Sequence, residues 1–178
     1  MIYVFLADGF EEMEALAPLD MLRRVGIEVK TVGVTGKTVT GAHQIPVVAD
    51  LVAEEIEVSL VDGIVLPGGM PGTLNLEKSQ VVQSMIDLCH QNGKLIAAIC
   101  AAPSILGHKG LLQGKKATCF PGFEKDCEGA WMQPDTVVTD GNMITAKGAG
   151  CAVPFGSALI TYIKDAKTAE KLLQDMQV

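Results

Sequence analysis

Short apolar runs that do not alternate with polar residues constrain the fold of this chain most strongly. Residues 2–6 read Ile-Tyr-Val-Phe-Leu, residues 63–66 read Gly-Ile-Val-Leu, and residues 94–99 read Lys-Leu-Ile-Ala-Ala-Ile, with a further run over residues 28–34. Such strands are typical of a parallel sheet that helices cover on both faces, since a sheet with one wet face alternates. Helical patterns between and after these runs predict a doubly wound α/β fold; they span residues 11–24, 80–91, 153–163 and 166–176.

Two shorter pairs of segments predict β-hairpins. One pair lies around Val39 and residues 45–48, and the other covers residues 136–139 and 143–145. The turn signal Asp140-Gly141-Asn142 joins the second pair. The 178 residues contain no linker, repeat or low-complexity tract, so we expect one domain over residues 1–178.

Composition and charge indicate which binding partners and which cellular compartment are favoured. With 48% hydrophobic and 20% charged residues, the chain is globular rather than disordered, and its formal charge of −7 disfavours nucleic acid and anionic membrane surfaces. No basic leader precedes the first apolar run, and no run approaches the roughly 20 residues of a membrane span, so we expect a cytoplasmic protein without membrane attachment. Five cysteines without a CxxC pair fit a reducing compartment. Cys119 and Cys127 lack a matching Cys/His pair, which disfavours zinc.

Cys100 is the principal candidate for chemistry. It stands where the apolar run over residues 94–99 gives way to a helix start at Ala101-Ala102-Pro103. A helix N-terminus favours thiolate over thiol and can lower a cysteine pKa from about 8.5 into roughly the 3.5 to 7.5 range. This position therefore predicts a nucleophile with a lowered pKa. The alternative is a buried structural cysteine, because free cysteine is among the most buried residue types.

The ends of two other strands carry further candidates, because sites in open α/β sheets form at the carboxyl ends of the strands. After the first strand, Glu11 and Glu12 are interpreted as solvated residues that complement the helix dipole. Glu14 is expected to be partly buried, because its neighbours are apolar, and Pro18 should loosen the helix beside it.

The third apolar run leads into Pro67-Gly68-Gly69-Met70-Pro71-Gly72. Glycine pairs let a ligand approach the backbone, so the free N–H groups of Gly68 and Gly69 could form an oxyanion-binding nest. A phosphate loop is disfavoured because the GxxxxGK[ST] spacing and its lysine are missing. A tight turn without a ligand remains the alternative.

Four motifs resemble the ThiJ/PfpI superfamily in order and spacing: Glu11-Glu12-Met13-Glu14, Leu66-Pro67-Gly68-Gly69, Ala97 to Pro103 around Cys100, and Gly148-Ala149-Gly150. The resemblance covers residues 2–163 and is nearest to the Parkinsonism-associated deglycase and glyoxalase branch, including its bacterial chaperone-like members. It implies a flavodoxin-like three-layer sandwich with a mostly parallel central sheet, helices on both faces, a cysteine nucleophile elbow, and a homodimer.

The resemblance also implies roles for individual residues. Glu14 would be a carboxylic acid hydrogen-bonded to the Cys100 thiolate, and the amides of Gly69 and Ala101 would be oxyanion donors. Gly68 and Gly148 belong to the same substrate-binding motifs. One of the two groups, Glu14 or Cys100, must hold a proton, because a carboxylate beside a thiolate would repel it.

The chain departs from the family pattern at two positions. Where human-like relatives have a histidine near the thiol, this chain reads Thr118-Cys119-Phe120-Pro121, which makes Phe120 a candidate pocket residue. Superfamily peptidases have a histidine directly after the nucleophile, and here Ala101 replaces it, which disfavours peptidase activity. The three histidines are interpreted as surface or helix-end residues, with His43 also a candidate for substrate contact.

The leading hypothesis is glutathione-independent chemistry on 2-oxoaldehydes such as methylglyoxal, or deglycation of their early adducts, without metal or organic cofactor. The partner would be a small aldehyde or glycated substrate. The alternative is a redox-responsive chaperone or stress sensor that works through oxidation of Cys100. A third interpretation is a binding domain with an unused cysteine. Cys151 could approach the pocket or could serve as a small packing residue at a helix start.

Overall fold

The computed structural model describes residues 1–178 and contains strands and helices in alternation. The strands are β1 Ile2–Leu6, β2 Val29–Gly33, β3 Thr38–Thr40, β4 Pro46–Val48, β5 Leu51–Val52, β6 Gly63–Leu66, β7 Leu95–Ile99, β8 Lys116–Ala117, β9 Trp131–Met132, β10 Val137–Asp140 and β11 Met143–Ala146. The helices are α1 Glu12–Arg24, α2 Gly72–Lys78, α3 Gln80–Gln91, α4 Pro103–His108, α5 Ala152–Ile163 and α6 Ala166–Asp175.

The central sheet has seven strands in the order β10-β11-β7-β6-β1-β2-β5. Every neighbouring pair is parallel except the hairpin of β10 and β11. The chain moves outward from β1 to β2 on one side and later returns to place β6 on the other side of β1. That reversal of direction lies between β1 and β6, which is where open α/β sheets form ligand crevices.

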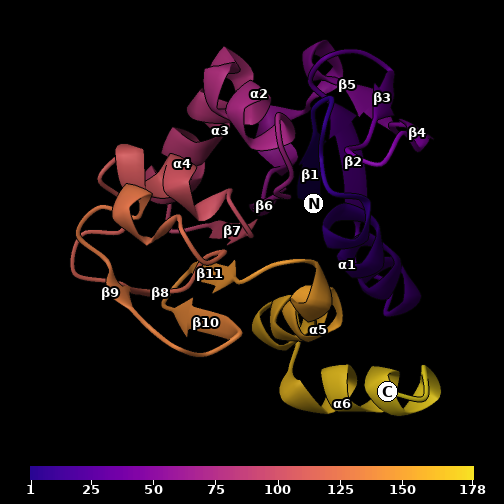
Figure 1. Cartoon of the computed structure of the whole chain (residues 1–178). Coiled ribbons are helices and arrows are strands. Elements are labelled where there is room, and N and C mark those ends of the chain that lie inside the picture. Colours follow the sequence, from indigo (N-terminus) through magenta and orange to yellow (C-terminus); the bar gives the residue numbers. More distant parts are fainter.

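Consecutive side chains of the strands serve two different cores. Ile2, Val4 and Leu6 of β1 join a cluster with residues of α1, α5 and α6. Tyr3 and Phe5, from the same strand, join a second cluster with residues of α3 and α4. Figure 1 shows α1, α5 and α6 on one side of the sheet and α2, α3 and α4 on the other. Both faces of the sheet are therefore buried, which confirms the three-layer α/β fold and explains why the strands read as unbroken apolar runs.

Both predicted hairpins are present, but only one of them belongs to the central sheet. β3 pairs with β4 as a separate two-stranded antiparallel sheet. β10 pairs antiparallel with β11, and β11 also pairs parallel with β7, so the second hairpin extends the main sheet. Sequence patterns did not predict α2, the two-residue β5, or the two-residue pair of β8 and β9. Glycines and prolines around α2 favour a loop.

α1 remains one continuous helix although Pro18 lies within it. Gly156 of α5 packs against this region, since a Cβ added at Gly156 would lie 3.3 Å from the Pro18 Cα. Helix packing therefore supports the helix at the position where proline weakens it. No helix combines the length and the apolar character that crossing a membrane requires.

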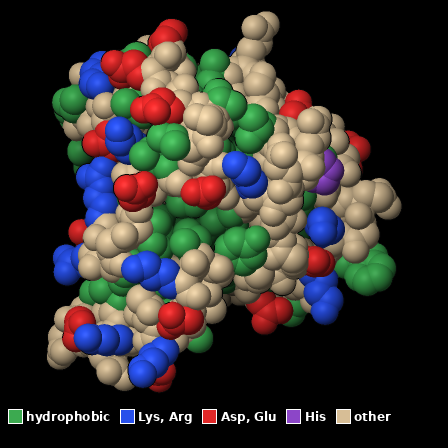
Figure 2. Space-filling view, turned by 180° about the vertical axis from the view of Figure 1, so that it is seen from behind, with side chains coloured by type: hydrophobic (Ala, Val, Ile, Leu, Met, Phe, Trp, Pro, Cys, Tyr) green, Lys and Arg blue, Asp and Glu red, His purple; other side chains and the backbone are tan.

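Charged side chains of both signs are mixed on the face that Figure 2 shows. Basic groups on that face lie among acidic groups rather than in a continuous stripe.

Candidate active site

Three neighbouring strands bring the predicted site residues together. Cys100 follows β7, Gly68 and Gly69 follow β6, and Glu14 lies in the first turns of α1, which follows β1. Because β7, β6 and β1 are adjacent and parallel, their carboxyl ends meet at one edge of the sheet. Residues up to 86 positions apart in the sequence, Glu14 and Cys100, become neighbours here.

The backbone of Cys100 adopts a conformation that is rare for a residue with a side chain. Its φ is 65°, in the left-handed region. The Cys100 N–H donates to the Ala146 carbonyl at 2.9 Å, and the Cys100 carbonyl accepts from the Phe120 N–H at 2.9 Å. Strain of this kind costs on the order of 1–3 kcal/mol and persists only where the surroundings hold it. The two hydrogen bonds hold the residue so that its thiol lies at the end of the sheet.

Three groups surround the Cys100 sulfur. The Glu14 carboxyl and the backbone N–H groups of Gly69 and Ala101 all hydrogen-bond with it. Burial first, and the Glu14 charge second, raise the pKa of the Cys100 thiol to about 12. The prediction that Cys100 has a lowered pKa is therefore wrong as long as Glu14 is ionised. α4 has only six residues, so it offers little dipole stabilisation, whereas desolvation and the adjacent carboxylate both disfavour a thiolate.

Glu14 is almost completely buried, with 1% of its surface exposed. Its Oε2 accepts a hydrogen bond from the Gly68 N–H at 2.9 Å. Burial is the main reason that the pKa of Glu14 rises to about 7, while the bonds to Cys100 and Gly68 oppose the rise. A neutral Glu14 would remove the charge that opposes the thiolate and could donate a hydrogen bond to sulfur. The arrangement therefore suits a pair that shares one proton near neutral pH.

Close backbone packing at the site requires glycine. A Cβ added at Gly68 would lie 2.5 Å from the Cys100 Cβ and 2.7 Å from Glu14 Oε2. Gly69 has a φ of 88°, which glycine adopts most readily, and this conformation accompanies the N–H donation to sulfur.

Phe120 and Gly148 lie near the second carboxyl oxygen of Glu14, Oε1. A Cβ added at Gly148 would lie 3.2 Å from the Phe120 ring and 3.8 Å from Glu14 Oε1. Phe120 is 46% exposed, so an aromatic side chain borders the site at its open side. Cys151 follows Gly148 closely and donates its N–H to the Gly148 carbonyl at 2.8 Å, at the start of α5.

Glu12 is not the solvated residue that the sequence predicted. Only 6% of it is exposed, and it accepts a hydrogen bond from the His43 N–H at 2.8 Å and contacts His43 Nδ1 at 2.7 Å. These bonds lower the pKa of Glu12 against the effect of its burial, and they raise the pKa of His43. Glu11 caps α1 by accepting from the Glu14 N–H at 2.8 Å. The sequence contained no signal for the pairing of Glu12 with a histidine 31 residues away.

The surface and helix-end positions of the three histidines are confirmed. The His43 side chain is 70% exposed, and His90 and His108 lie in the last turns of α3 and α4. His108 contacts Glu77 at 2.6 Å, away from Cys100.

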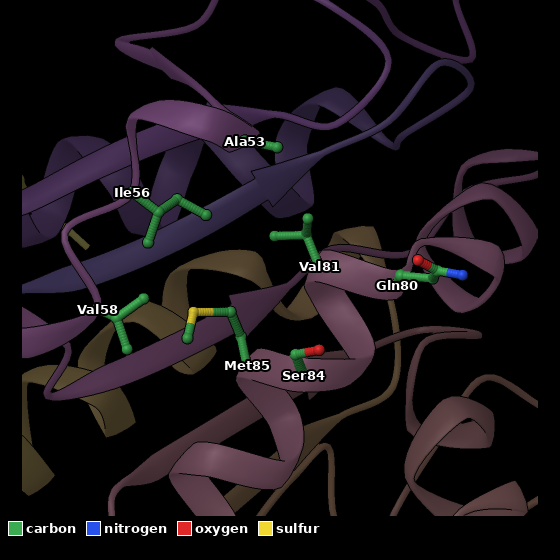
Figure 3. Close-up of a pocket in the computed structure, with 7 residues that line it drawn as sticks. All are labelled: Ala53, Ile56, Val58, Gln80, Val81, Ser84 and Met85. Carbon is green, nitrogen blue, oxygen red and sulfur yellow. The ribbon is translucent and has the colours of Figure 1, made fainter.

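A separate groove lies between α3 and the segment that follows β5. Its volume is about 370 Å³, and Figure 3 shows its apolar side chains Ile56, Val58, Val81 and Met85. None of its lining residues is ionisable. It therefore offers a place for apolar contact, and its lining contains no acid or base that could activate the Ser84 hydroxyl.

The fold and the site together define a class of α/β protein in which a strained cysteine at the end of a parallel strand faces a buried carboxylic acid. The model of the DJ-1/PfpI family matches residues 1–162, and the chain belongs to this family. Protein dj-1beta of Drosophila melanogaster is 33% identical over 98% of this chain and 95% of its own length. A deglycase of Pyrococcus abyssi is 32% identical over 84% of this chain and 90% of its own length.

A solved structure agrees with the sequence relatives. Oxidized DJ-1 of Toxoplasma gondii superposes with a TM-score of 0.94 at 32% identity, covering 99% of this chain and 97% of that chain. Proteins with the name deglycase among the relatives support enzymatic, DJ-1-type activity in broad terms.

Proposed function

We propose that this protein converts 2-oxoaldehydes such as methylglyoxal to hydroxy acids, or deglycates their early adducts, without glutathione and without a cofactor. The observation that carries the proposal is the set of hydrogen bonds around the Cys100 sulfur, from the Glu14 carboxyl and the N–H groups of Gly69 and Ala101. This set combines a nucleophile, a proton carrier and two donors for a developing negative charge.

The reaction begins with proton transfer within the Cys100 and Glu14 pair. Glu14 holds the proton while the thiolate attacks the aldehyde carbon and forms a hemithioacetal. The carbonyl oxygen becomes an oxyanion, and the N–H groups of Gly69 and Ala101, which donate to sulfur before the reaction, stabilise it. Charge stabilisation of this kind is usually the largest contribution to catalysis.

Glu14 then moves a proton between adjacent carbons of the substrate. Glu14 first gives its proton to the oxyanion, and its carboxylate then removes the proton of the former aldehyde carbon to form an enediolate. Glu14 returns this proton to the neighbouring carbon, and the hydroxyl proton passes to the neighbouring oxygen, which turns the hemithioacetal into a 2-hydroxyacyl thioester. Water attacks the thioester, the Cys100 thiolate leaves, and methylglyoxal has become lactate with the net addition of one water. A pKa of about 7 suits Glu14 to both accepting and returning the proton near neutral pH.

Lactate formation from methylglyoxal in glutathione-free buffer tests this proposal. Cys100→Ser should reduce the rate by at least about 1,000-fold, because it replaces the nucleophile. Cys89→Ala is the matched control, since Cys89 is a buried cysteine on α3 outside the site. Full activity in Cys100→Ser, or equal loss in both variants, would contradict the mechanism.

The rate at which a preformed adduct disappears shows whether the substrate is the free aldehyde or the adduct. The hemithioacetal of methylglyoxal and N-acetylcysteine dissociates at a measurable spontaneous rate. Adduct loss faster than this rate in the presence of enzyme indicates deglycation. Adduct loss limited to this rate indicates action on the free aldehyde.

A redox-sensing role is the second candidate, and the oxidized Toxoplasma gondii relative favours its consideration. Sulfinate oxygens on Cys100 would meet the same donors, with neutral Glu14 as one of them. Peroxide should then stop at two added oxygens on the tryptic peptide of residues 95–109, and Glu14→Gln should allow a third. Continuous oxidation of the wild-type peptide to three oxygens would contradict this role.

We also propose that the protein acts as a cytoplasmic homodimer. Met13 on α1 and Val48 on β4 are more than half exposed, at 57% and 70%, and burial of such side chains favours association. Light scattering after size exclusion at micromolar concentration tests the dimer, and a monomeric mass would contradict it.

A further inference from the structure

Two cysteines outside the Cys100 site lie against each other. Cys119 follows β8, and Cys127 follows the short 3-10 helix at Glu124–Asp126. Their exposed fractions are 3% and 2%, and their thiols are hydrogen-bonded to each other. The mechanism at Cys100 uses neither of them.

The chain between the two cysteines is folded so that it holds them together. The Phe123 N–H donates to the Phe120 carbonyl at 3.1 Å, and the Cys127 N–H donates to the Glu124 carbonyl at 3.3 Å. Gly107 of α4 lets Cys127 pack closely, since a Cβ at Gly107 would lie 2.7 Å from the Cys127 Cα. The contact between the thiols is therefore a fixed feature of the fold rather than a chance approach of two free side chains.

Cys119 also borders a cavity that opens to solvent. The cavity has a volume of about 370 Å³, and Cys119, Glu124, Gln133 and Lys147 are among its lining residues. Cys127 is not among them. A small oxidant can thus approach the pair from the Cys119 side.

Contact between the two thiols affects the pKa of each. The hydrogen bond from Cys127 lowers the pKa of Cys119, while burial and the charges of Glu124 and Asp126 oppose this change. The same bond and burial raise the pKa of Cys127. Cys119 borders the cavity and is the thiol that a peroxide meets first, and ionisation of one thiol leaves the other to donate a hydrogen bond to it.

We propose that Cys119 and Cys127 form a redox-active dithiol that hydroperoxides oxidise to an intramolecular disulfide. The Cys119 thiolate attacks a peroxide oxygen, the O–O bond breaks, and Cys119 becomes a sulfenic acid as the peroxide is reduced to an alcohol or water. The Cys127 sulfur then attacks the Cys119 sulfur, and water leaves. The dithiol loses two electrons and two protons in total, and a thiol reductant reverses the change.

Peptide mapping of the wild-type protein tests the proposal directly, because trypsin places every cysteine on a different peptide. Cleavage after Lys116, Lys125 and Lys147 puts Cys119 on residues 117–125 and Cys127 on residues 126–147. After hydrogen peroxide and blocking of free thiols, we expect a linked species two hydrogens lighter than the sum of these peptides. Reduction should abolish it. We expect the two peptides to lose their free thiols about tenfold faster than the peptide of Cys89.

Two results with the wild-type protein would overturn the proposal. In one, Cys119 and Cys127 stay reduced at a peroxide dose that oxidises Cys100. In the other, Cys119 is linked to the peptide of residues 95–109, which carries Cys100. A Cys127→Ser variant adds a separate check: Cys119 should then react with a sulfenic acid probe, because the thiol that resolves it is gone. Absence of that adduct in a variant with wild-type circular dichroism would also overturn the proposal.

Discussion

Glu14 Oε2 accepts a 2.9 Å hydrogen bond from the backbone N–H of Gly68, and this bond ties the acid on α1 to the loop after β6. The same carboxyl contacts the Cys100 sulfur. The nucleophile, the acid and the glycine loop are therefore held as one unit, and a change in one of them should alter the others.

Stability should depend on pH through Glu14. Its pKa rises from 4.5 to about 7 in the folded protein, so the folded state binds a proton more tightly than the unfolded state. The resulting stabilisation is complete below about pH 4.5 and is lost as pH rises through 7. The free energy of unfolding of the wild type relative to Glu14→Gln should fall by about 3 kcal/mol between pH 4 and pH 8. Urea denaturation at several pH values measures this difference, and a constant difference would contradict the raised pKa.

Gly68→Ala should damage both stability and activity. The new methyl group would lie 2.5 Å from the Cys100 Cβ and 2.7 Å from Glu14 Oε2, so the site must shift at a cost of about 1–3 kcal/mol. Gly150→Ala is the matched control, since a Cβ there has nothing within 4 Å. Unfolding curves and lactate formation should change in Gly68→Ala alone. Equal behaviour of the two variants would argue against the close packing.

The pairing of Glu12 with His43 should be visible in the titration of the imidazole. Hydrogen bonding and the charge of Glu12 raise the pKa of His43. Glu12→Gln should bring the pKa back toward its ordinary value, which proton NMR of the histidine ring measures. His108 is the internal control, because Glu77 raises its pKa independently of Glu12. A His43 titration that is unchanged in Glu12→Gln would show that the pair does not form.

The left-handed backbone at Cys100 should reverse the usual order of alanine and glycine. At a φ of 65°, Cys100→Gly should be about 1 kcal/mol more stable than Cys100→Ala, since only alanine carries a Cβ that opposes this conformation. Ala158→Gly within α5 is the control with the opposite expected change in stability, because glycine in a helix costs about 1 kcal/mol relative to alanine. Chemical denaturation of the three variants tests both signs, and a more stable Cys100→Ala would contradict the strain.

Local sequence patterns predicted secondary structure correctly where the residues of a single segment decide its conformation. The runs that became β1, β6 and β7 have little polar character because helices cover both faces of the sheet. The turn at Asp140-Gly141-Asn142 predicted the hairpin of β10 and β11 for a similar reason, since its residues themselves favour the turn.

Local patterns failed where a distant segment decides. Glu11 and Glu12 are identical neighbours at a helix start, yet only Glu12 is buried against His43. The spacing of Cys119 and Cys127 gave no reason to expect that their thiols touch. Both contacts arise from chain segments that fold back on each other, and no periodicity of the sequence records them.

The sequence by itself determined the α/β class, the parallel direction of its apolar strands, and the position of Cys100 at a strand end, because the burial of a strand is visible in its own residues. Only the tertiary structure decided the acidity of that cysteine. Its pKa depends on desolvation and on a carboxyl group that α1 brings in from 86 residues away, and these effects outweigh the short helix that begins beside it.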